Sequence, residues 1–205
     1  MTATHHASSP ARPGLRERKK IKTRAAIRRA TYELIAARGY EATTVEQIAA
    51  AAEVSPSTVI RYFPAKEDIV LSDEQDEATE AALRARPAGE PVLRSLRHVV
   101  REQLRAALDG APDVRADLLL RARLLRDVPA VRSRLMDSRS ACGRALGAII
   151  AARTGRPEDD LKCRVLATAV VGSLVETTLY WAEHDCADDL LGLVDEAFDA
   201  FEDGL

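Results

Sequence analysis

The chain has 205 residues, and its 30 Lys and Arg against 32 Asp and Glu give a formal net charge of −2. This length accommodates one small and one medium-sized domain. No uninterrupted apolar run of about 18 residues is present and the N-terminus lacks the apolar core of a signal peptide, so we expect a cytoplasmic protein with no membrane span. Cys142, Cys163 and Cys186 are odd in number and lack C-x-x-C spacing, which argues against a disulfide framework or a zinc site and predicts buried, inert thiols.

The charge is distributed unevenly. Residues 1–70 hold 12 Lys and Arg against 7 Asp and Glu, whereas the rest of the chain holds 18 against 25. Residues 1–15 are rich in Ala, Ser, Pro and His and predict a disordered arm, in which two histidines are too few to indicate a metal site. Most of the positive excess then follows within one stretch, at Arg16, Arg18, Lys19, Lys20, Lys22, Arg24, Arg28 and Arg29. This stretch is either a solvated helix start or a phosphate-binding surface, and the segments that follow it favour the second interpretation.

Three helices with a common core are predicted next. A helix of about residues 18–38 carries an apolar stripe and ends at Gly39 in the C′ position; its stripe is Ile27, Ala30, Leu34 and Ile35. Thr44 to Gln47 forms a capping-box pattern that opens a second, short helix. Ser55 is placed as the N-cap of a third helix and Pro56 fits its first position. Only residues 53–55 separate the second and third helices, which is the length of the turn in a helix-turn-helix unit.

The third helix has two contrasting sides. Val59 and Phe63, at i, i+4 spacing, are expected to face the core. The side chains of Ser57, Thr58, Arg61 and Tyr62 are then expected to point outward. This predicts a short helix that presents a polar, hydrogen-bonding and basic face to a partner.

At these residues the chain resembles the TetR family of bacterial transcriptional regulators. The family pattern for the second and third helices, T-[VI]-x-x-I-A-x-x-A-G-V-S-x-x-T-[LV]-Y-x-[YH]-F-x-x-K-[ED], is matched in register by Thr44, Val45, Ile48, Ala49, Ala52, Val54, Ser55, Thr58, Val59, Tyr62, Phe63, Lys66 and Glu67. Two positions depart from it. Glu53 replaces the turn glycine, which predicts a strained left-handed residue or a different turn. Ile60 replaces a DNA-contacting tyrosine, so one contact to DNA is altered.

The resemblance, which covers about residues 18–70, implies a set of DNA contacts. Base edges would be met by Pro56, Ser57, Thr58, Ile60 and Arg61, and phosphates by Thr44, Tyr62 and Lys66. It divides the chain into the arm at 1–15, a DNA-binding domain at 16–64, and a ligand-binding and dimerisation domain at 65–205. The expected partners are a double-stranded DNA operator, a second copy of the chain and a small-molecule effector.

The rest of the chain predicts only helices, so the fold class is all-α. Pro and Gly separate helical blocks at about 66–86, 91–108, 113–127, 129–153, 157–184 and 187–203, and no alternating strand pattern intervenes. The 157–184 helix is apolar nearly all round and is therefore expected to be buried on two sides, one of them against a partner. The last helix carries a long stripe at Leu190, Val194, Ala197 and Phe201. These two helices predict a four-helix bundle across a two-fold axis, with an ordinary intramolecular core as the alternative.

An effector site is predicted from two charges. Arg121 falls within the apolar stripe of the 113–127 helix, which includes Leu118 and Leu125, so it either anchors an anionic ligand or pairs with Asp117 one turn earlier. Pairing is the favoured interpretation. Glu176 has the same ambiguity between a ligand, Arg121 and a dimer interface. Tyr180 is a candidate ligand contact that more often is a core or interface aromatic.

The stretch from about residue 115 to 183 loosely resembles, in helical layout, the ligand-binding domain of TetR regulators that sense acyl-CoA-like molecules. The sequence therefore predicts a dimeric, ligand-responsive repressor, with an activator or a helical-bundle interaction protein that has lost DNA binding as alternatives. No enzyme is expected, because G-x-S-x-G, P-loop, G-x-G-x-x-G and H-E-x-x-H motifs are all lacking. No cofactor or metal is expected either.

Overall fold

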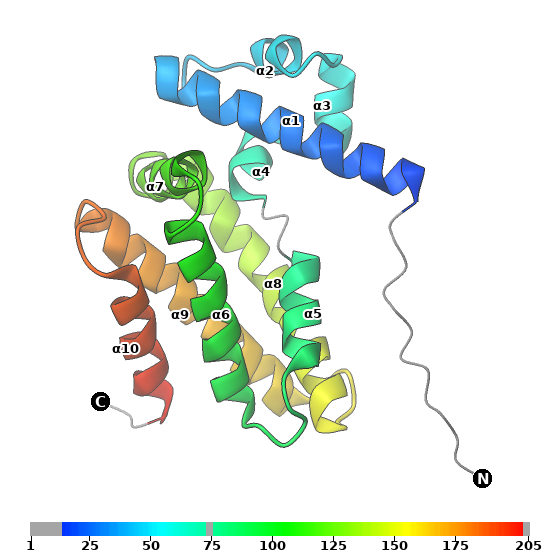
Figure 1. The fold of residues 1–205 in the computed structure, drawn as a ribbon, viewed down its shortest axis with the longest axis vertical. Coiled ribbons are helices and arrows are strands. Elements are labelled where there is room, and N and C mark those ends of the chain that lie inside the picture. The colour runs from blue at the N-terminus through cyan, green and yellow to red at the C-terminus, as the bar shows by residue number, and fades with distance from the viewer. Residues whose placement is uncertain (1–13, 73–75, 203–205) are drawn as a thin grey trace. The chain divides into compact units, whose positions relative to one another are not determined.

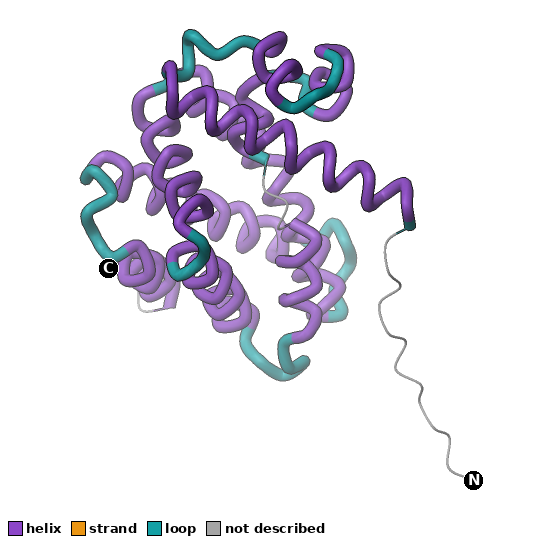
Figure 2. The backbone as a smooth tube through the Cα atoms, turned by 45° about the horizontal axis from the view of Figure 1, so that its top comes forward, coloured by secondary structure: helices purple, strands orange, loops and turns teal. Residues whose placement is uncertain are grey.

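The computed structural model describes residues 14–72 and 76–202, and within these ranges all regular structure is helical (Figures 1 and 2). The all-α prediction is thus confirmed. The chain divides after Pro64 into two compact units. The predicted arm at 1–15 lies outside the described residues except for its last two positions, and Leu15 already begins the first helix.

The first unit contains α1 (Leu15–Arg38), α2 (Val45–Ala51) and α3 (Pro56–Tyr62). Most of the predicted core positions are buried, at Ile27, Ala30, Ile35, Val59 and Phe63, whereas the predicted Leu34 is half-buried. Ile48 and Ala49 of α2 complete this core. α1 ends at Gly39, whose φ of 83° is a conformation that glycine adopts without steric cost. Thr31 is fully buried and its hydroxyl donates to the Ile27 carbonyl at 2.8 Å, so a polar group in this core is satisfied.

The second unit is a bundle of helices. Its elements are α4 (Lys66–Leu71), α5 (Asp76–Ala85), α6 (Val92–Leu108), α7 (Pro112–Asp127), α8 (Pro129–Thr154), α9 (Leu161–Glu183) and α10 (Leu190–Glu202). α8 and α9 pack closely, because Gly143 and Gly147 are buried where α8 meets Thr168 and Arg164 of α9. The main core gathers side chains from α5, α6, α8, α9 and α10, among them Leu83, Leu96, Ile150, Val170 and Phe198.

One predicted helix is wrong. The 66–86 block is two helices, and α4 ends at Leu71, before the C-cap residue Ser72, whose backbone is extended (φ −64°, ψ 124°). The Ser72 hydroxyl donates to the Ile69 carbonyl at 3.0 Å. Serine competes in this way for backbone groups at a helix end, which explains the interruption that apolar periodicity did not reveal.

Two other helices begin later than predicted. α9 starts at Leu161 because Asp160 is its N-cap: the Cys163 amide donates to the Asp160 carboxylate at 3.1 Å, and this bond is the main cause of the lowered pKa of that carboxyl. α10 starts at Leu190 and not at 187. The prediction for the thiols holds only in part, since Cys163 is buried but Cys142 is exposed and Cys186 is half-buried.

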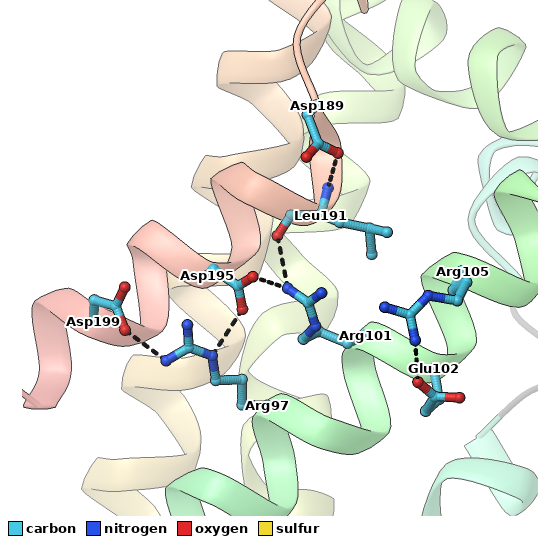
Figure 3. A network of polar contacts seen from close by, with 8 residues as sticks. All are labelled: Arg97, Arg101, Glu102, Arg105, Asp189, Leu191, Asp195 and Asp199. Carbon is cyan, nitrogen blue, oxygen red and sulfur yellow. Dashed lines mark hydrogen bonds and ion pairs between the residues drawn. The ribbon is translucent and has the colours of Figure 1, made fainter.

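Ion pairs hold α10 against α6 (Figure 3). The Arg97 Nε donates to Asp195 at 2.8 Å and its Nη1 reaches Asp199, while Arg101 pairs with the other oxygen of Asp195. The apolar stripe of α10 faces inward at Leu190, Val194 and Phe198. Its predicted continuation at Phe201 is 37% exposed, so the stripe belongs mainly to the core of its own subunit.

Candidate nucleic-acid interface and ligand site

α2 and α3 are fixed by caps that the sequence predicts. The Gln47 amide donates to the Thr44 hydroxyl at 3.4 Å and the Thr44 amide donates to the Gln47 side chain at 3.1 Å, which completes the capping box. At the start of α3, the Thr58 amide donates to the Ser55 hydroxyl at 3.2 Å. Both helix starts are thus satisfied by local side chains.

The turn between α2 and α3 contains a strained residue. Glu53 has φ 55°, the left-handed conformation expected at the position where the family pattern has glycine. The turn keeps its hydrogen bonds, with the Glu53 amide donating to Ala50 and the Val54 amide donating to Ala49. A residue with a Cβ therefore occupies a geometry that glycine adopts more easily.

α3 has a buried apolar side and a more exposed polar side. Val59 is 1% exposed and Phe63, just after the helix, is 3% exposed. On the other side, Pro56, Ser57, Ile60 and Arg61 are exposed, whereas Thr58 and Tyr62 are half-buried. The Ser55 hydroxyl lies 2.9 Å from the hydroxyls of both Ser57 and Thr58, so the cap also orients two of the predicted base contacts.

Arg24 differs from the rest of the basic stretch because it contacts the end of α3. Its Nη1 donates to the Tyr62 carbonyl at 3.2 Å, and its guanidinium lies 4.4 Å from the centre of the Phe63 ring. This half-buried cation therefore sits at the C-terminal end of α3, where free carbonyls and the helix dipole favour positive charge. The sequence grouped Arg24 with possible phosphate contacts, although its i, i+3 spacing to buried Ile27 placed it on the core side of α1.

Most of the remaining basic residues of the stretch are exposed on α1. The exposed ones are Arg16, Arg18, Lys19, Lys20, Lys22 and Arg29. Arg29 forms a long 3.8 Å ion pair with Glu33. Of the two other predicted phosphate contacts outside α3, Thr44 is exposed, and Lys66 is the half-buried first residue of α4 in the second unit.

The predicted ligand residues are not brought together. Arg121 is half-buried on α7, where the neighbouring Arg123 is exposed, and it lies among half-buried Leu118 and buried Leu125. The adjacent apolar cluster contains Ala122, Trp181, Ala182 and Leu190, with Leu104, Leu118 and Leu119 against it. The Trp181 indole is 2% exposed and donates to the Asp188 carbonyl at 3.0 Å, so this aromatic is a core residue.

Glu176 and Tyr180 line a different feature. An open groove of about 460 Å³ runs between α9 and α10, lined by Ser173, Glu176, Thr177, Tyr180, Leu193, Glu196 and Ala197. Glu176 is exposed, although it lies on the helix that was expected to be buried on two sides, and Tyr180 is 46% exposed and stacks on His184. The two carboxylates of this groove are poorly suited to an anionic group. Within the ranges 14–72 and 76–202, no cluster of His, Cys, Asp and Glu has the geometry of a metal site.

Two family models match the chain. The model described as "Bacterial regulatory proteins, tetR family" matches residues 27–72, which include α2, α3 and α4. The model described as "MftR C-terminal domain", one of the TetR C-terminal domains, matches residues 91–205.

Comparison with individual proteins agrees with these matches. The HTH-type transcriptional regulator TcmR of Streptomyces glaucescens is 37% identical over 205 residues, covering 97% of this chain and 89% of its own. Among solved structures, Thermus thermophilus FadR in complex with lauroyl-CoA superimposes with a TM-score of 0.56 at 22% identity, covering 89% of this chain and 94% of that one. FadR from Bacillus halodurans gives a TM-score of 0.55 at 24% identity, with 95% and 98% coverage. At these identities the two structures support the fold.

Proposed function

The chain belongs to the TetR family of bacterial transcriptional regulators and is a ligand-responsive DNA-binding regulator, and we propose that it acts in the cytoplasm as a homodimeric repressor that an effector releases from a palindromic operator. The observation that carries this proposal is the capped α3, which buries Val59 and exposes a polar face. Regulators of this family bind operators and small-molecule effectors and act as dimers. Two recognition helices held by a dimer would read two half-sites.

We assign base contacts to one part of this face and phosphate contacts to another. Pro56, Ser57, Thr58, Ile60 and Arg61 would meet base edges, and Thr44, Tyr62 and Lys66 would meet phosphates. Ile60 is 55% exposed and offers an apolar surface suited to a thymine methyl group. The exposed cations of α1 would add contacts that do not depend on sequence.

The test compares one residue of each kind across a panel of operator variants. Arg61→Ala is expected to cost about 1–3 kcal/mol and to relax specificity at one position of each half-site, if the guanidinium reads a guanine. Tyr62→Phe, which removes only a hydroxyl, is expected to weaken all sequences alike. Affinity should also fall with salt, by about 0.9 in log K per unit of log salt for each phosphate contact. Footprinting that recovers no preferred palindromic site would reject the operator proposal and favour a protein-interaction role.

For the effector, we propose an acyl-CoA-like molecule that is bound in the second unit. Arg121 supplies a half-buried cation for an anionic group, and Leu118 and Leu125 supply apolar surface. Lauroyl-CoA, which is bound by the Thermus thermophilus FadR of similar fold, is therefore the first probe. Glu176 and Tyr180 belong to the exposed face of α9, and we do not include them in this effector site.

Arg121→Met keeps much of the side-chain bulk and removes the charge. If Arg121 contacts the effector, the variant should bind operator as the wild type does but require more lauroyl-CoA for release. If Arg121 has a structural role, its thermal midpoint should fall without a selective effect on release. Arg123→Met, on the exposed face of the same helix, is the matched control. An unchanged response of Arg121→Met in both assays would remove this residue from the site.

A further inference from the structure

The guanidinium of Arg61 lies against the ring of its neighbour Tyr62. Its Cζ is 5.3 Å from the centre of that ring, which is within the range of a cation–π contact. Arg61 is exposed and Tyr62 is half-buried, and both belong to the last turn of α3. Within the ranges 14–72 and 76–202 no carboxylate pairs with Arg61. The ring therefore restrains the guanidinium while its five N–H donors remain available to a partner.

Tyr62 is itself held from α1. Its carbonyl accepts a hydrogen bond from the Arg24 Nη1 at 3.2 Å. The next residue, Phe63, is 3% exposed, its ring centre lies 4.4 Å from the Arg24 guanidinium, and its amide donates to the Val59 carbonyl at 2.8 Å. These contacts fix the backbone at a helix end that would otherwise fray, and with it the direction in which the Tyr62 ring leaves the chain. A series of contacts thus runs from Arg24 through Tyr62 to Arg61.

The place of Arg61 in α3 explains why such support is needed. The N-terminal residues of a recognition helix reach the base edges most directly, whereas Arg61 is the last residue but one of α3. A bidentate contact to guanine needs the planar guanidinium in one orientation, and an exposed arginine side chain has many rotamers. A neighbour that limits these rotamers before binding reduces the entropy that is lost on binding.

We propose that the ring of Tyr62 positions Arg61 for its base contact, and that Arg24 supports this ring by holding the Tyr62 carbonyl. The proposal rests on the base contact assigned to Arg61 above and adds the residues that direct it. It gives the two parts of the Tyr62 side chain separate roles, because the hydroxyl would meet a phosphate whereas the ring acts on Arg61. Tyr62 and Arg24 are then positioning residues, whose effect on sequence preference passes through Arg61.

Operator preference at one base position tests this role. That position is the one at which Arg61→Ala loses the preference for guanine. Tyr62→Leu removes the ring and should reduce the preference there by about two- to fivefold, as expected for an exposed cation–π contact. Tyr62→Phe keeps the ring, so it should retain the full preference while binding all operators more weakly. Arg24→Met should reduce the same preference. In an Arg61→Ala background, neither Tyr62→Leu nor Arg24→Met should change it further.

The order of the Arg61 side chain can be measured without DNA and without any variant. In the free wild-type protein, nitrogen-15 relaxation should give the Arg61 Nε–H group a higher order parameter than that of Arg29, whose side chain is 78% exposed. Tyr62→Phe should preserve this order, and Tyr62→Leu should lower it towards the value of Arg29. Circular dichroism should show both variants folded.

The outcomes separate this proposal from the base contact on which it rests. If Arg61→Ala changes no base preference, the assignment of Arg61 to a base edge fails, and the positioning role fails with it. If Arg61→Ala relaxes the preference but folded Tyr62→Leu keeps it and weakens all operators alike, the base contact stands and the positioning role is wrong. An order parameter of Arg61 equal to that of Arg29 in the free wild type would also overturn the positioning role.

Discussion

Arg24→Met should loosen the recognition helix without removing a contact to DNA. The wild-type guanidinium donates to the carbonyl of Tyr62, the last residue of α3, at 3.2 Å and lies 4.4 Å from the Phe63 ring centre. Methionine retains most of the aliphatic chain, so the substitution removes the hydrogen bond and the cation–π contact and leaves much of the packing.

The expected loss of local stability at the end of α3 can be estimated from these two contacts. A hydrogen bond from a charged donor contributes about 1.5–3 kcal/mol, and the length of this one places it at the lower end. A partly exposed cation–π contact adds about 0.5–1 kcal/mol. We therefore expect the free energy of local opening at the end of α3 to fall by about 2 kcal/mol. Hydrogen exchange of the α3 amides in the full-length protein should become about 30-fold faster.

Arg29→Met is the control, because Arg29 lies on the same helix with its side chain 78% exposed, and its ion pair with Glu33 is long, at 3.8 Å. Its effect on exchange should correspond to less than about 0.5 kcal/mol. The competing role for Arg24 is a phosphate contact. Unchanged exchange in Arg24→Met, combined with a salt dependence of operator binding that is shallower by about 0.9 in log–log slope, would establish that role and refute our interpretation.

Two further substitutions address strain and charge. Glu53→Gly should raise the free energy of unfolding measured in urea by about 0.5–1 kcal/mol, because relief of the left-handed strain at φ 55° exceeds the entropy that glycine gains when unfolded. Glu53→Ala keeps the Cβ and should not show this gain. A glycine variant less stable than the wild type would contradict the argument. Glu90 has its pKa lowered from 4.5 to about 2, first by the hydrogen bond from Arg86 and then by that from Ser95, so its stabilising effect is complete above pH 4.5 and is lost as the pH falls towards 2. The difference in melting temperature between wild type and Glu90→Gln should therefore close over that interval when followed by circular dichroism, and a difference independent of pH would exclude the carboxylate as its source.

The first unit was predictable because its signals are local. The Thr44 capping box and the Ser55 cap with Pro56 lie within four residues of the groups that they satisfy, and both occur in the structure as expected. The left-handed turn at Glu53 could be predicted because the position, and not the residue type, determined the conformation. Arg24 was grouped with the surface cations of α1 because charge patterning does not distinguish a surface cation from one placed at the end of a neighbouring helix.

In the second unit, the contacts that fix the helices against one another join residues distant in sequence. Arg153 donates to the carbonyls of Leu83, Arg86 and Pro87 and to the Ser95 hydroxyl, which fixes the end of α5 and the turn into α6 against α8. Helical periodicity places such a residue on a face but does not identify its partners. The same limit explains why Arg121 and Glu176 were considered together although they line different surfaces.

Apolar residues on α10 and α9 serve different purposes, because some are buried in the core of the subunit and others are exposed on its surface. Val194 is 1% exposed within the core of its own subunit, whereas Val165 on α9 is 58% exposed. A charge at position 194 would be buried without a partner, so Val194→Asp should destabilise the subunit by several kcal/mol and remove cooperative unfolding, and loss of the dimer would then follow from loss of the fold. Val165→Asp places its charge in water in the isolated subunit, and two such charges enter the interface only on association. It should therefore keep the wild-type far-ultraviolet spectrum, sediment as a monomer and lose operator affinity. If Val165→Asp remains a dimer while folded, the exposed face of α9 lies outside the interface, and if Val194→Asp melts as the wild type does, α10 contributes less to the subunit core than its burial indicates.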